Sequence, residues 1–333
     1  MRNGHRVITL EEHFATADYR QGDGGALLPQ VAAMFADRID DIEQYRLPEM
    51  DRSGIDVQVL SLTGPGVQQE TDAELAIERA RRSNDALAKV VEAYPARFRA
   101  FAALPTQDPL AAARELERCV TELGFVGALV NGHTNGVYLD DARYEPLWAT
   151  LTRIGVPLYL HPVFPAVMPA VLEGYPEMSA AAWGWGFETA SHALRLVLSG
   201  LFDRHPTATL ILGHMGEGLP FALGRLDDRW SIMRHTVELD ELPSCYVRRN
   251  LFVTTAGVES HAPLACAISE LGAERVLFSV DYPYQSIDTS AEFMATAPIA
   301  EHERALIFGQ NAESLLALDS VQMRPAARIA ENR

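Results

Sequence analysis

The sequence predicts a (β/α)₈ TIM barrel, and three observations support this fold class. Eight short apolar runs rich in β-branched residues alternate with segments of helical periodicity, which is typical of a parallel sheet or barrel. Several runs lack in–out alternation, as expected when both faces of a strand are buried. At 333 residues with 48% hydrophobic side chains, the chain can bury one large core. The expected strands are residues 6–13, 57–62, 98–104, 127–131, 157–161, 209–214, 251–255 and 276–281.

The helices expected between these strands follow from apolar periodicity and from end signals. Asp108 before Pro109 is typical of an N-cap followed by a first-turn proline. Gly124, Gly155 and Gly272 each follow a helical segment, where a glycine cap is common. The expected helices are residues 73–93, 108–123, 141–154, 187–203, 217–233, 260–271 and 299–318.

The chain is expected to be one catalytic domain, residues 1–318. Residues 319–333 lose helical periodicity, so they form either a disordered tail or an arm lying on another subunit. Two long loops are predicted after strands 1 and 5, at residues 14–50 and 162–186, and both leave strands that carry candidate ligands. The second loop is apolar and rich in Pro, Gly, Met and Trp. It either packs on the barrel or a neighbouring subunit, or it forms a wall over an apolar, aromatic ligand.

Charge and composition exclude several classes of partner. The net charge of −17 opposes binding to nucleic acid and to anionic membranes. No stretch approaches the roughly 18 uninterrupted apolar residues that a membrane helix needs. Cys119, Cys245 and Cys266 show no metal or redox spacing, and we expect buried thiols of a reducing compartment. The N-terminus lacks a secretory signal, so a cytoplasmic protein without nucleic-acid or membrane partners is predicted.

Metal-type side chains stand at the downstream ends of three expected strands. Glu11 and His13 end the first, His161 ends the fifth and Asp281 ends the eighth. A parallel barrel gathers these ends around one mouth. Because residues i and i+2 of a strand point the same way, Glu11 and His13 should both face the interior while Glu12 faces away. Two imidazoles with carboxylate oxygens suit a divalent ion such as Zn²⁺ or Mn²⁺, with positions left open for a substrate.

Other polar residues are expected at the same mouth. His214 ends the sixth strand, and Glu217 would fix its tautomer and favour its charged form, unless Glu217 is simply a first-turn residue favoured by the helix dipole. Arg225, about two helical turns beyond Glu217, is either a ligand for an anionic group or an ordinary surface cation. Tyr284 would hydrogen-bond a substrate or cap its strand, and Asn131 ends the fourth strand.

The ordered motifs resemble those of one enzyme group. The runs ITLEEHF, NGHTNG, LYLHP, GHMGEGLPF and FSVDYPY look like the amidohydrolase-related aromatic acid decarboxylases, which include γ-resorcylate, 2,3-dihydroxybenzoate and 5-carboxyvanillate decarboxylases. The resemblance extends from about residue 6 to residue 318. Glu-x-His on the first strand matters most, because hydrolytic amidohydrolases and the aminocarboxymuconate semialdehyde decarboxylase branch carry His-x-His there.

The resemblance implies an amidohydrolase-like barrel with one divalent metal ion per subunit, Mn²⁺ or Zn²⁺, and no organic cofactor. It implies that Asp281 donates the proton to carbon while His214 and Glu217 stabilise or relay charge. It also implies a homodimer or homotetramer. The metal ligands would be Glu11, His13, His161 and Asp281.

The implied reaction is a reversible, non-oxidative decarboxylation of an ortho-hydroxybenzoate, a small aromatic carboxylic acid. The metal would chelate the carboxylate and the ortho-oxygen, and the ipso carbon is protonated first because an aryl carbanion is too unstable to form unaided. The alternatives are a metal-dependent hydrolase of a lactone, ester or amide, and a non-catalytic barrel that binds an aromatic ligand. Substrate contacts would come from Arg225, Asn131, Tyr284, Trp185 and Phe187.

Overall fold

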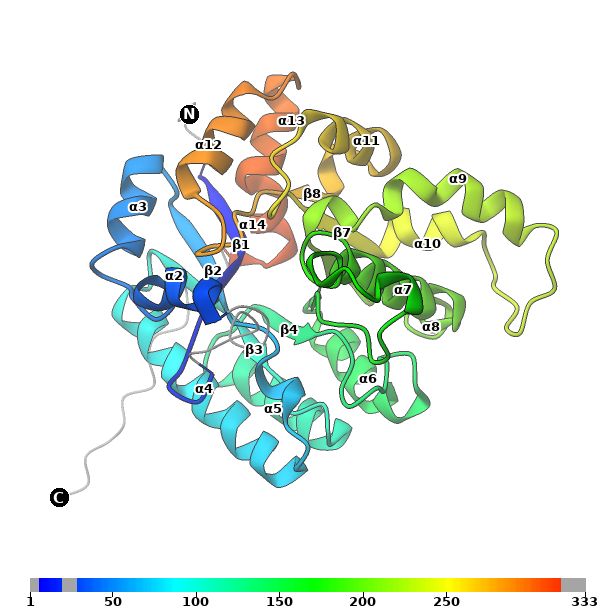
Figure 1. Cartoon of the computed structure of the whole chain (residues 1–333), viewed down its shortest axis with the longest axis horizontal. Helices are drawn as coiled ribbons and strands as arrows, with labels where there is room; N and C mark the ends of the chain where they lie inside the picture. Colours follow the sequence, from blue (N-terminus) through cyan, green and yellow to red (C-terminus); the bar gives the residue numbers. More distant parts are fainter. Residues whose placement is uncertain (1–5, 20–28, 319–333) are drawn as a thin grey trace.

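The computed structural model describes residues 6–19 and 29–318. Eight parallel strands follow one another in chain order, β1 to β8, and form a nearly closed barrel with helices around it (Figure 1). All eight expected strands are present, which confirms the fold. The sixth and eighth are much shorter than expected. The strands are β1 Ile8–Phe14, β2 Val57–Leu62, β3 Phe98–Ala103, β4 Gly127–Asn131, β5 Leu158–His161, β6 Leu210–Leu212, β7 Leu251–Thr254 and β8 Val276–Leu277.

The barrel closes between its first and last strands through a few backbone contacts. Leu10 pairs with Ser279 in a single parallel bridge beyond the end of β8. Nearer the mouth, the His13 amide donates a 2.7 Å hydrogen bond to the Tyr282 carbonyl. The segment that follows β8 therefore runs beside β1 up to the site.

A β-bulge in β1 decides which of its side chains enter the barrel. The register of β1 against β2 shifts just before Glu12, and Glu11 has a φ of +63°. Before the bulge, Ile8 and Leu10 belong to the apolar cluster of the barrel interior. An extra residue reverses the alternation. Glu11 and His13 consequently face inward and Glu12 faces outward, as the sequence predicted.

Most expected helices are confirmed with small changes at their ends. The Asp108 carboxylate accepts hydrogen bonds from the amides of Leu110 and Ala111, as an N-cap does. Gly155 ends its helix in the left-handed conformation, at φ +69°. The confirmed helices are α4 Ala73–Ala93, α5 Pro109–Thr121, α6 Glu145–Ile154, α7 Gly184–Leu198, α9 Leu219–Trp230 and α11 His261–Leu271.

Two expected helices are interrupted. The segment 187–203 becomes α7 and a short α8, Leu201–Arg204, because Gly200 between them is left-handed at φ +70°. The segment 299–318 becomes three consecutive pieces. They are α13 Glu301–Ala305, the π-helical turn η7 Leu306–Gln310 and α14 Asn311–Leu315. The helix expected at residue 217 begins two residues later, since Glu217 and Gly218 both have positive φ.

Four helices were not predicted, and two of them lie in the long loop after β1. They are α2 Pro29–Ile39, α3 Arg46–Ser53, α10 Pro243–Asn250 and α12 Ile287–Thr296. Short 3₁₀ turns complete the chain at η1 Gly66–Gln69, η2 Ala142–Tyr144, η3 Ala170–Leu172, η4 Pro176–Met178, η5 His214–Gly216 and η6 Ala273–Arg275. The α9–α10 pair and its connecting loop project from the barrel (Figure 1).

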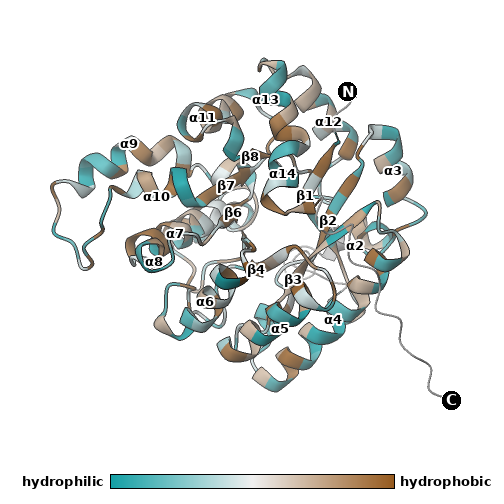
Figure 2. Ribbon diagram, turned by 180° about the vertical axis from the view of Figure 1, so that it is seen from behind, coloured by the Kyte–Doolittle hydropathy of each residue, from teal (hydrophilic) through white to brown (hydrophobic). Residues whose placement is uncertain are grey.

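Apolar side chains form two layers. A small cluster that includes Val57, Val59 and Phe101 fills the barrel, and a larger one lies between the strands and the helices. The helices around the barrel carry mixed hydrophilic and hydrophobic faces, while the strands inside are largely hydrophobic (Figure 2). Of the three cysteines, all free, only Cys119 is buried, so the expectation of three buried thiols was wrong. In the described part of the chain, no helix is both long and apolar enough to cross a membrane. The predicted tail, 319–333, lies outside the described residues.

Candidate metal and active site

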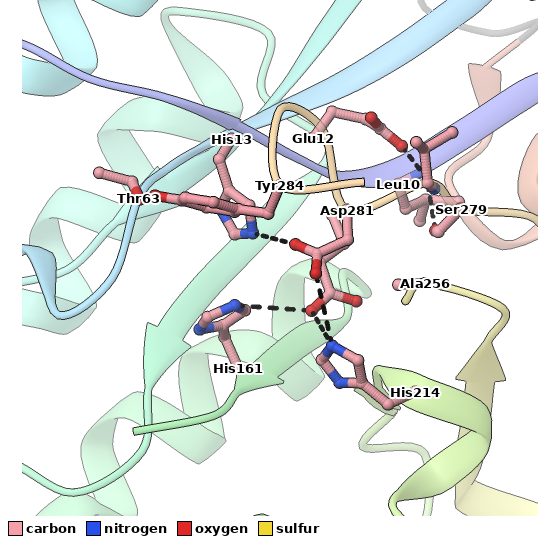
Figure 3. A network of polar contacts seen from close by, with 12 residues as sticks. Leu10, Glu12, His13, Thr63, His161, His214, Ala256, Ser279, Asp281 and Tyr284 are labelled. Atoms are coloured by element: carbon pink, nitrogen blue, oxygen red, sulfur yellow. Dashed lines mark hydrogen bonds and ion pairs between the residues drawn. The ribbon is translucent and has the colours of Figure 1, made fainter. Parts of the chain in front are cut away.

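Three predicted ligands form a compact group at the barrel mouth. One candidate ligand atom from each of Glu11, His13 and His161 lies within 4.8 Å of the others, and all three residues are buried. β1 supplies the first two and β5 supplies the third. Figure 3 shows the two imidazoles beside Asp281, with Glu12 turned away from them. The i, i+2 spacing on β1 and the convergence of strand ends thus bring together residues 150 positions apart in the chain.

Hydroxyl groups from the barrel interior hold the Glu11 carboxylate. The hydroxyl of Tyr159 donates a hydrogen bond to Glu11 Oε2, and the hydroxyl of Thr254 donates to the same oxygen at 3.3 Å. Just after β6, a Cβ at Gly213 would lie 2.6 Å from Glu11 Oε2, so any larger residue there would displace the carboxylate. Sequence reasoning missed Tyr159, although the i, i+2 rule places it directly below His161.

The remaining atoms of this group fit a divalent cation. Glu11 Oε1 is buried and has no hydrogen-bond partner among the described residues, and it lies 3.5 Å from His161 Nε2. Burial lowers the pKa of His161 well below its ordinary value, so its ring is neutral and keeps a lone pair for a ligand. Burial also raises the pKa of Glu11 to about 7, which reflects a carboxylate whose charge is poorly compensated. A cation would supply that compensation.

Asp281 completes the polar mouth from the segment after β8, which runs beside β1. Its Oδ1 lies 3.1 Å from His13 Nε2, and its Oδ2 lies 3.7 Å from His214 Nε2. It stands beside the compact Glu-His-His group without belonging to it. Burial alone would raise the pKa of Asp281, but hydrogen bonds from His13 and His214 outweigh burial and lower that pKa. Asp281 is therefore a carboxylate in this arrangement.

Glu217 holds the ring of His214 by a hydrogen bond within one tight turn. Nδ1 of His214 lies 2.7 Å from Glu217 Oε1, which leaves Nε2 facing the carboxylates of Glu11 and Asp281, each at 3.7 Å. Burial would lower the pKa of His214, but the charges of Glu217 and Glu11 raise it well above the ordinary value. A Cβ at Gly186 would lie 2.9 Å from Glu217 Oε2, so the start of α7 closes over this pair. The predicted His–Glu contact is present.

A cavity of about 1370 Å³ opens from these residues toward the surface. His161, His214, Glu217 and Asp281 line its inner end. Of the predicted substrate contacts, Tyr284 lines it from the segment after β8, and Trp185 and Phe187 line it from the first turn of α7. The hydroxyl of Tyr284 shares a 2.7 Å hydrogen bond with that of Thr63. The apolar segment before α7 is therefore a cavity wall, one of the two roles considered for it.

Two predicted substrate contacts do not line this cavity, and two aromatic residues that do were missed. Arg225 lies on an exposed part of α9, away from the cavity. Asn131 is buried at the end of β4, where its side-chain amide faces Gln68. The missed residues, Phe35 and Phe221, come from α2 and α9. Phe35 lies on a helix of the long loop after β1 and Phe221 on the first turn of a barrel helix, and strand-end reasoning locates neither position.

A family model for amidohydrolases matches residues 13–318. The chain belongs to the amidohydrolase family. Among curated members of similar sequence, γ-resorcylate decarboxylase of Polaromonas sp. is 44% identical over 321 residues, covering 94% of this chain and 98% of the relative. The corresponding enzyme of Rhodococcus jostii is 44% identical with the same coverage. The resemblance inferred from the motifs is thus confirmed.

Solved structures of the family superpose closely on this chain. The 2,6-dihydroxybenzoate decarboxylase from Rhizobium is 42% identical with a TM-score of 0.89, covering 95% of this chain and 99% of that one. The dihydroxybenzoic acid decarboxylase from Polaromonas sp., solved with bound manganese and the inhibitor 2-nitroresorcinol, is 43% identical with a TM-score of 0.90, covering 95% and 98%. These members therefore share the whole barrel with this chain.

Proposed function

We propose that this protein is a metal-dependent aromatic acid decarboxylase, a carboxy-lyase, that acts on a dihydroxybenzoate of the γ-resorcylate type. One observation carries the proposal: the buried Glu11–His13–His161 group and the His214–Glu217 pair meet at the inner end of an apolar, aromatic-lined cavity. The identity of 44% to γ-resorcylate decarboxylase over nearly the whole of both chains supports the same assignment.

We propose Mn²⁺ as the ion, since related structures were solved with manganese. Glu11, His13 and His161 would hold it, with Asp281 at the edge of the group. The ion supplies a Lewis-acidic anchor for the carboxylate and ortho-oxygen of the substrate. The Glu11 carboxylate suits Mn²⁺, whereas the two imidazoles suit Zn²⁺, so the choice of Mn²⁺ rests on the related structures.

Proton delivery is assigned to His214 and Asp281. Losing CO₂ directly would leave an aryl carbanion, so a proton must first reach the ipso carbon. Asp281 is the proposed donor, but its lowered pKa means that it must receive a proton before it can give one. His214 carries that proton, because its pKa is raised, and its Nε2 lies 3.7 Å from Asp281 Oδ2. Glu217 balances the charge on the imidazole from behind.

The cavity wall orients and shields the ring. Phe35, Trp185 and Phe187 present apolar surface to a flat substrate and keep water from competing for the transferred proton. The Tyr284 ring lies beside that of His13, with their centroids 5.5 Å apart, and its hydroxyl is held by Thr63. That hydroxyl is positioned to meet a polar substituent of the ring.

The activity is tested by incubating Mn²⁺-loaded protein with a panel of hydroxybenzoates while following the loss of the acid's ultraviolet band and the release of CO₂. We expect turnover of a 2,6-dihydroxybenzoate-type acid and carboxylation at high bicarbonate. Lactone or ester turnover with no decarboxylation across the panel would favour the hydrolase alternative. Metal analysis tests whether the barrel is catalytic at all. Either enzyme should contain a metal ion in the wild type and lose it in His161→Ala, whereas a non-catalytic barrel would bind no metal in either protein.

We propose further that the protein is a homodimer or homotetramer in which a neighbouring subunit covers the cavity mouth. Phe221, Trp183 and Phe187 line that mouth with exposed fractions of 87%, 62% and 52%. Apolar surface of this kind marks a protein–protein contact, and a second copy is the proposed occupant. Light scattering should report a mass above 36.6 kDa per particle, and Phe221→Glu should lower it toward that of one chain.

A further inference from the structure

Behind the site, on the side of β1 away from the cavity, lie a buried carboxyl group and a buried guanidinium group that are linked through Gln58. Glu12 on β1 and Arg46 at the start of α3 are both 0% exposed. Neither lines the cavity. Charged side chains are rarely buried to this extent unless they are paired.

Arg46 is bound to the ligand strand by its guanidinium group. Nη2 donates a 2.5 Å hydrogen bond to the backbone carbonyl of His13, and Nη1 donates to Gln58 Oε1 at 3.2 Å. The guanidinium also lies over the ring of Tyr282, 4.3 Å from its centroid. Tyr282 directly follows Asp281, so one side chain contacts the backbone of a proposed metal ligand and the neighbour of the proposed proton donor.

Glu12 makes the complementary connection. Its Oε1 accepts a 3.0 Å hydrogen bond from the amide of Val280, the residue before Asp281. Its Oε2 accepts from Gln58 Nε2 at 3.4 Å. Gln58 in turn accepts from Arg46, so the amide group of Gln58 links the two charges. The connected side chains bridge β1 and the segment after β8, where only a few backbone contacts close the barrel.

Burying a glutamate and an arginine together is not an efficient way to stabilise the folded state. Removing two charges from water costs more than their attraction usually returns, and apolar residues of similar volume are often as stable or more stable. The pair does, however, fix the backbone on both sides of the His13–Asp281 contact. That contact joins the metal group to the proton donor, and a small displacement there would misalign both.

We propose that Glu12 and Arg46 are positioning residues that set the relative placement of His13 and Asp281, and that they are retained for the site and not for folding. The inference rests on the proposed function for its catalytic consequence. Its structural consequence, the geometry of the metal site, does not depend on which substrate is used.

The test compares Glu12→Gln, Arg46→Met and the double variant Glu12→Leu/Arg46→Met. In Glu12→Gln, the new NH₂ group would point a donor at the NH₂ group of Gln58. If Gln58 turned its amide over to accept this donor, its own NH₂ group would face Arg46. In both cases two donors meet, so the network breaks while the side-chain volume is kept. We expect Mn²⁺ affinity to fall about 10–100-fold in each single variant, as it does when groups supporting metal ligands are removed. The electron paramagnetic resonance spectrum of bound Mn²⁺ should broaden, and kcat should fall with KM little changed.

The double variant separates positioning from folding. Its apolar replacement should restore thermal stability above that of either single variant, because no buried charge is left without a partner, while Mn²⁺ affinity, the resonance spectrum and kcat remain impaired. Arg52→Met is the matched control, because Arg52 lies on the same helix and pairs with Asp288 in solvent. Its Mn²⁺ affinity, resonance spectrum and kcat should equal those of the wild type.

Wild-type Mn²⁺ affinity and spectrum in Glu12→Gln would overturn the proposal, as would their full recovery in the double variant. If no hydroxybenzoate is turned over even by the wild type, the proposed function fails, and metal affinity and the resonance spectrum still decide the positioning role.

Discussion

Glu217 fixes the tautomer of His214, because its carboxylate lies 2.7 Å from Nδ1 and leaves Nε2 as the atom that faces the reacting groups. Both residues are in the left-handed region, at φ +55° and φ +50°. The turn therefore folds the carboxylate back onto the imidazole three residues earlier. A regular helix start would not by itself direct the Glu217 carboxylate onto Nδ1 of His214.

Glu217→Gln should shift the pH profile of turnover. The negative charge of Glu217 helps to raise the pKa of His214, so removing it lowers that pKa and His214 loses its proton at a lower pH. We expect the basic limb of kcat/KM against pH to move to lower pH, with a loss of about 10²-fold at neutral pH. Glu238→Gln, an exposed carboxylate, is the control. An unmoved basic limb would contradict the role of Glu217.

Tyr159→Phe should weaken metal binding. The substitution removes the hydroxyl that donates to Glu11 Oε2 and leaves Thr254 as the remaining donor to that oxygen. We expect the Mn²⁺ dissociation constant, measured by competition with a chelating dye, to rise about 10–100-fold. Thr254→Val should give a smaller rise, because its 3.3 Å bond is longer. Equal Mn²⁺ affinities in the wild type, Tyr159→Phe and Thr254→Val would show that metal binding by Glu11 does not depend on these two hydroxyl groups.

Gly213→Ala should remove the metal without unfolding the barrel. The added Cβ would stand 2.6 Å from Glu11 Oε2, so the carboxylate must leave its place. Gly224→Ala is the matched control, since no heavy atom lies within 4 Å of a Cβ there. Elemental analysis should find little Mn²⁺ in the first variant and a full complement in the second. Full occupancy in Gly213→Ala would mean that Glu11 is not required as a ligand.

His192→Gln should make stability less sensitive to acid. Burial lowers the pKa of His192 to about 3, where Nε2 accepts a hydrogen bond from the Leu139 amide. The unfolded chain binds a proton near pH 6.5 that the folded protein rejects, so this residue destabilises the fold as pH falls below about 6.5. Between about pH 7.5 and about pH 5.5 the wild type should lose about 1.4 kcal/mol more than the variant.

Urea denaturation at each pH provides the measurement. The Gln side chain keeps an acceptor for the Leu139 amide, so the variant should fold at neutral pH. Parallel stability curves for the two proteins would contradict the assignment of a neutral, buried imidazole at position 192.

The sequence was sufficient for the site residues that lie on strands. Glu11, His13, His161, His214 and Asp281 could be placed together because a parallel barrel sends every strand end to one mouth. Short β-branched apolar runs and helix periodicity are local properties, so the eight strands and most helices followed from them.

Residues carried by loops could not be placed in the same way. Phe35 and Phe221 line the cavity from helices whose position depends on tertiary packing. Arg225 was assigned to the substrate from helical spacing and from the family resemblance, with a surface cation as the alternative. It lies on an exposed part of α9, which begins after two left-handed residues. α3 and α10 are only eight residues long, too short for periodicity to identify.

The bulge in β1 gives two adjacent, chemically identical residues different tasks. With strict alternation continuing from Leu10, Glu12 would enter the barrel and Glu11 would meet the helices. One positive backbone torsion, at Glu11, exchanges them. The glutamate of the metal-type group and the glutamate linked to Arg46 through Gln58 are therefore distinguished by backbone conformation and not by side-chain type. Straightening the strand at Glu11 without removing any residue would exchange the electrostatic environments of the two carboxylates while leaving the composition of the strand unchanged.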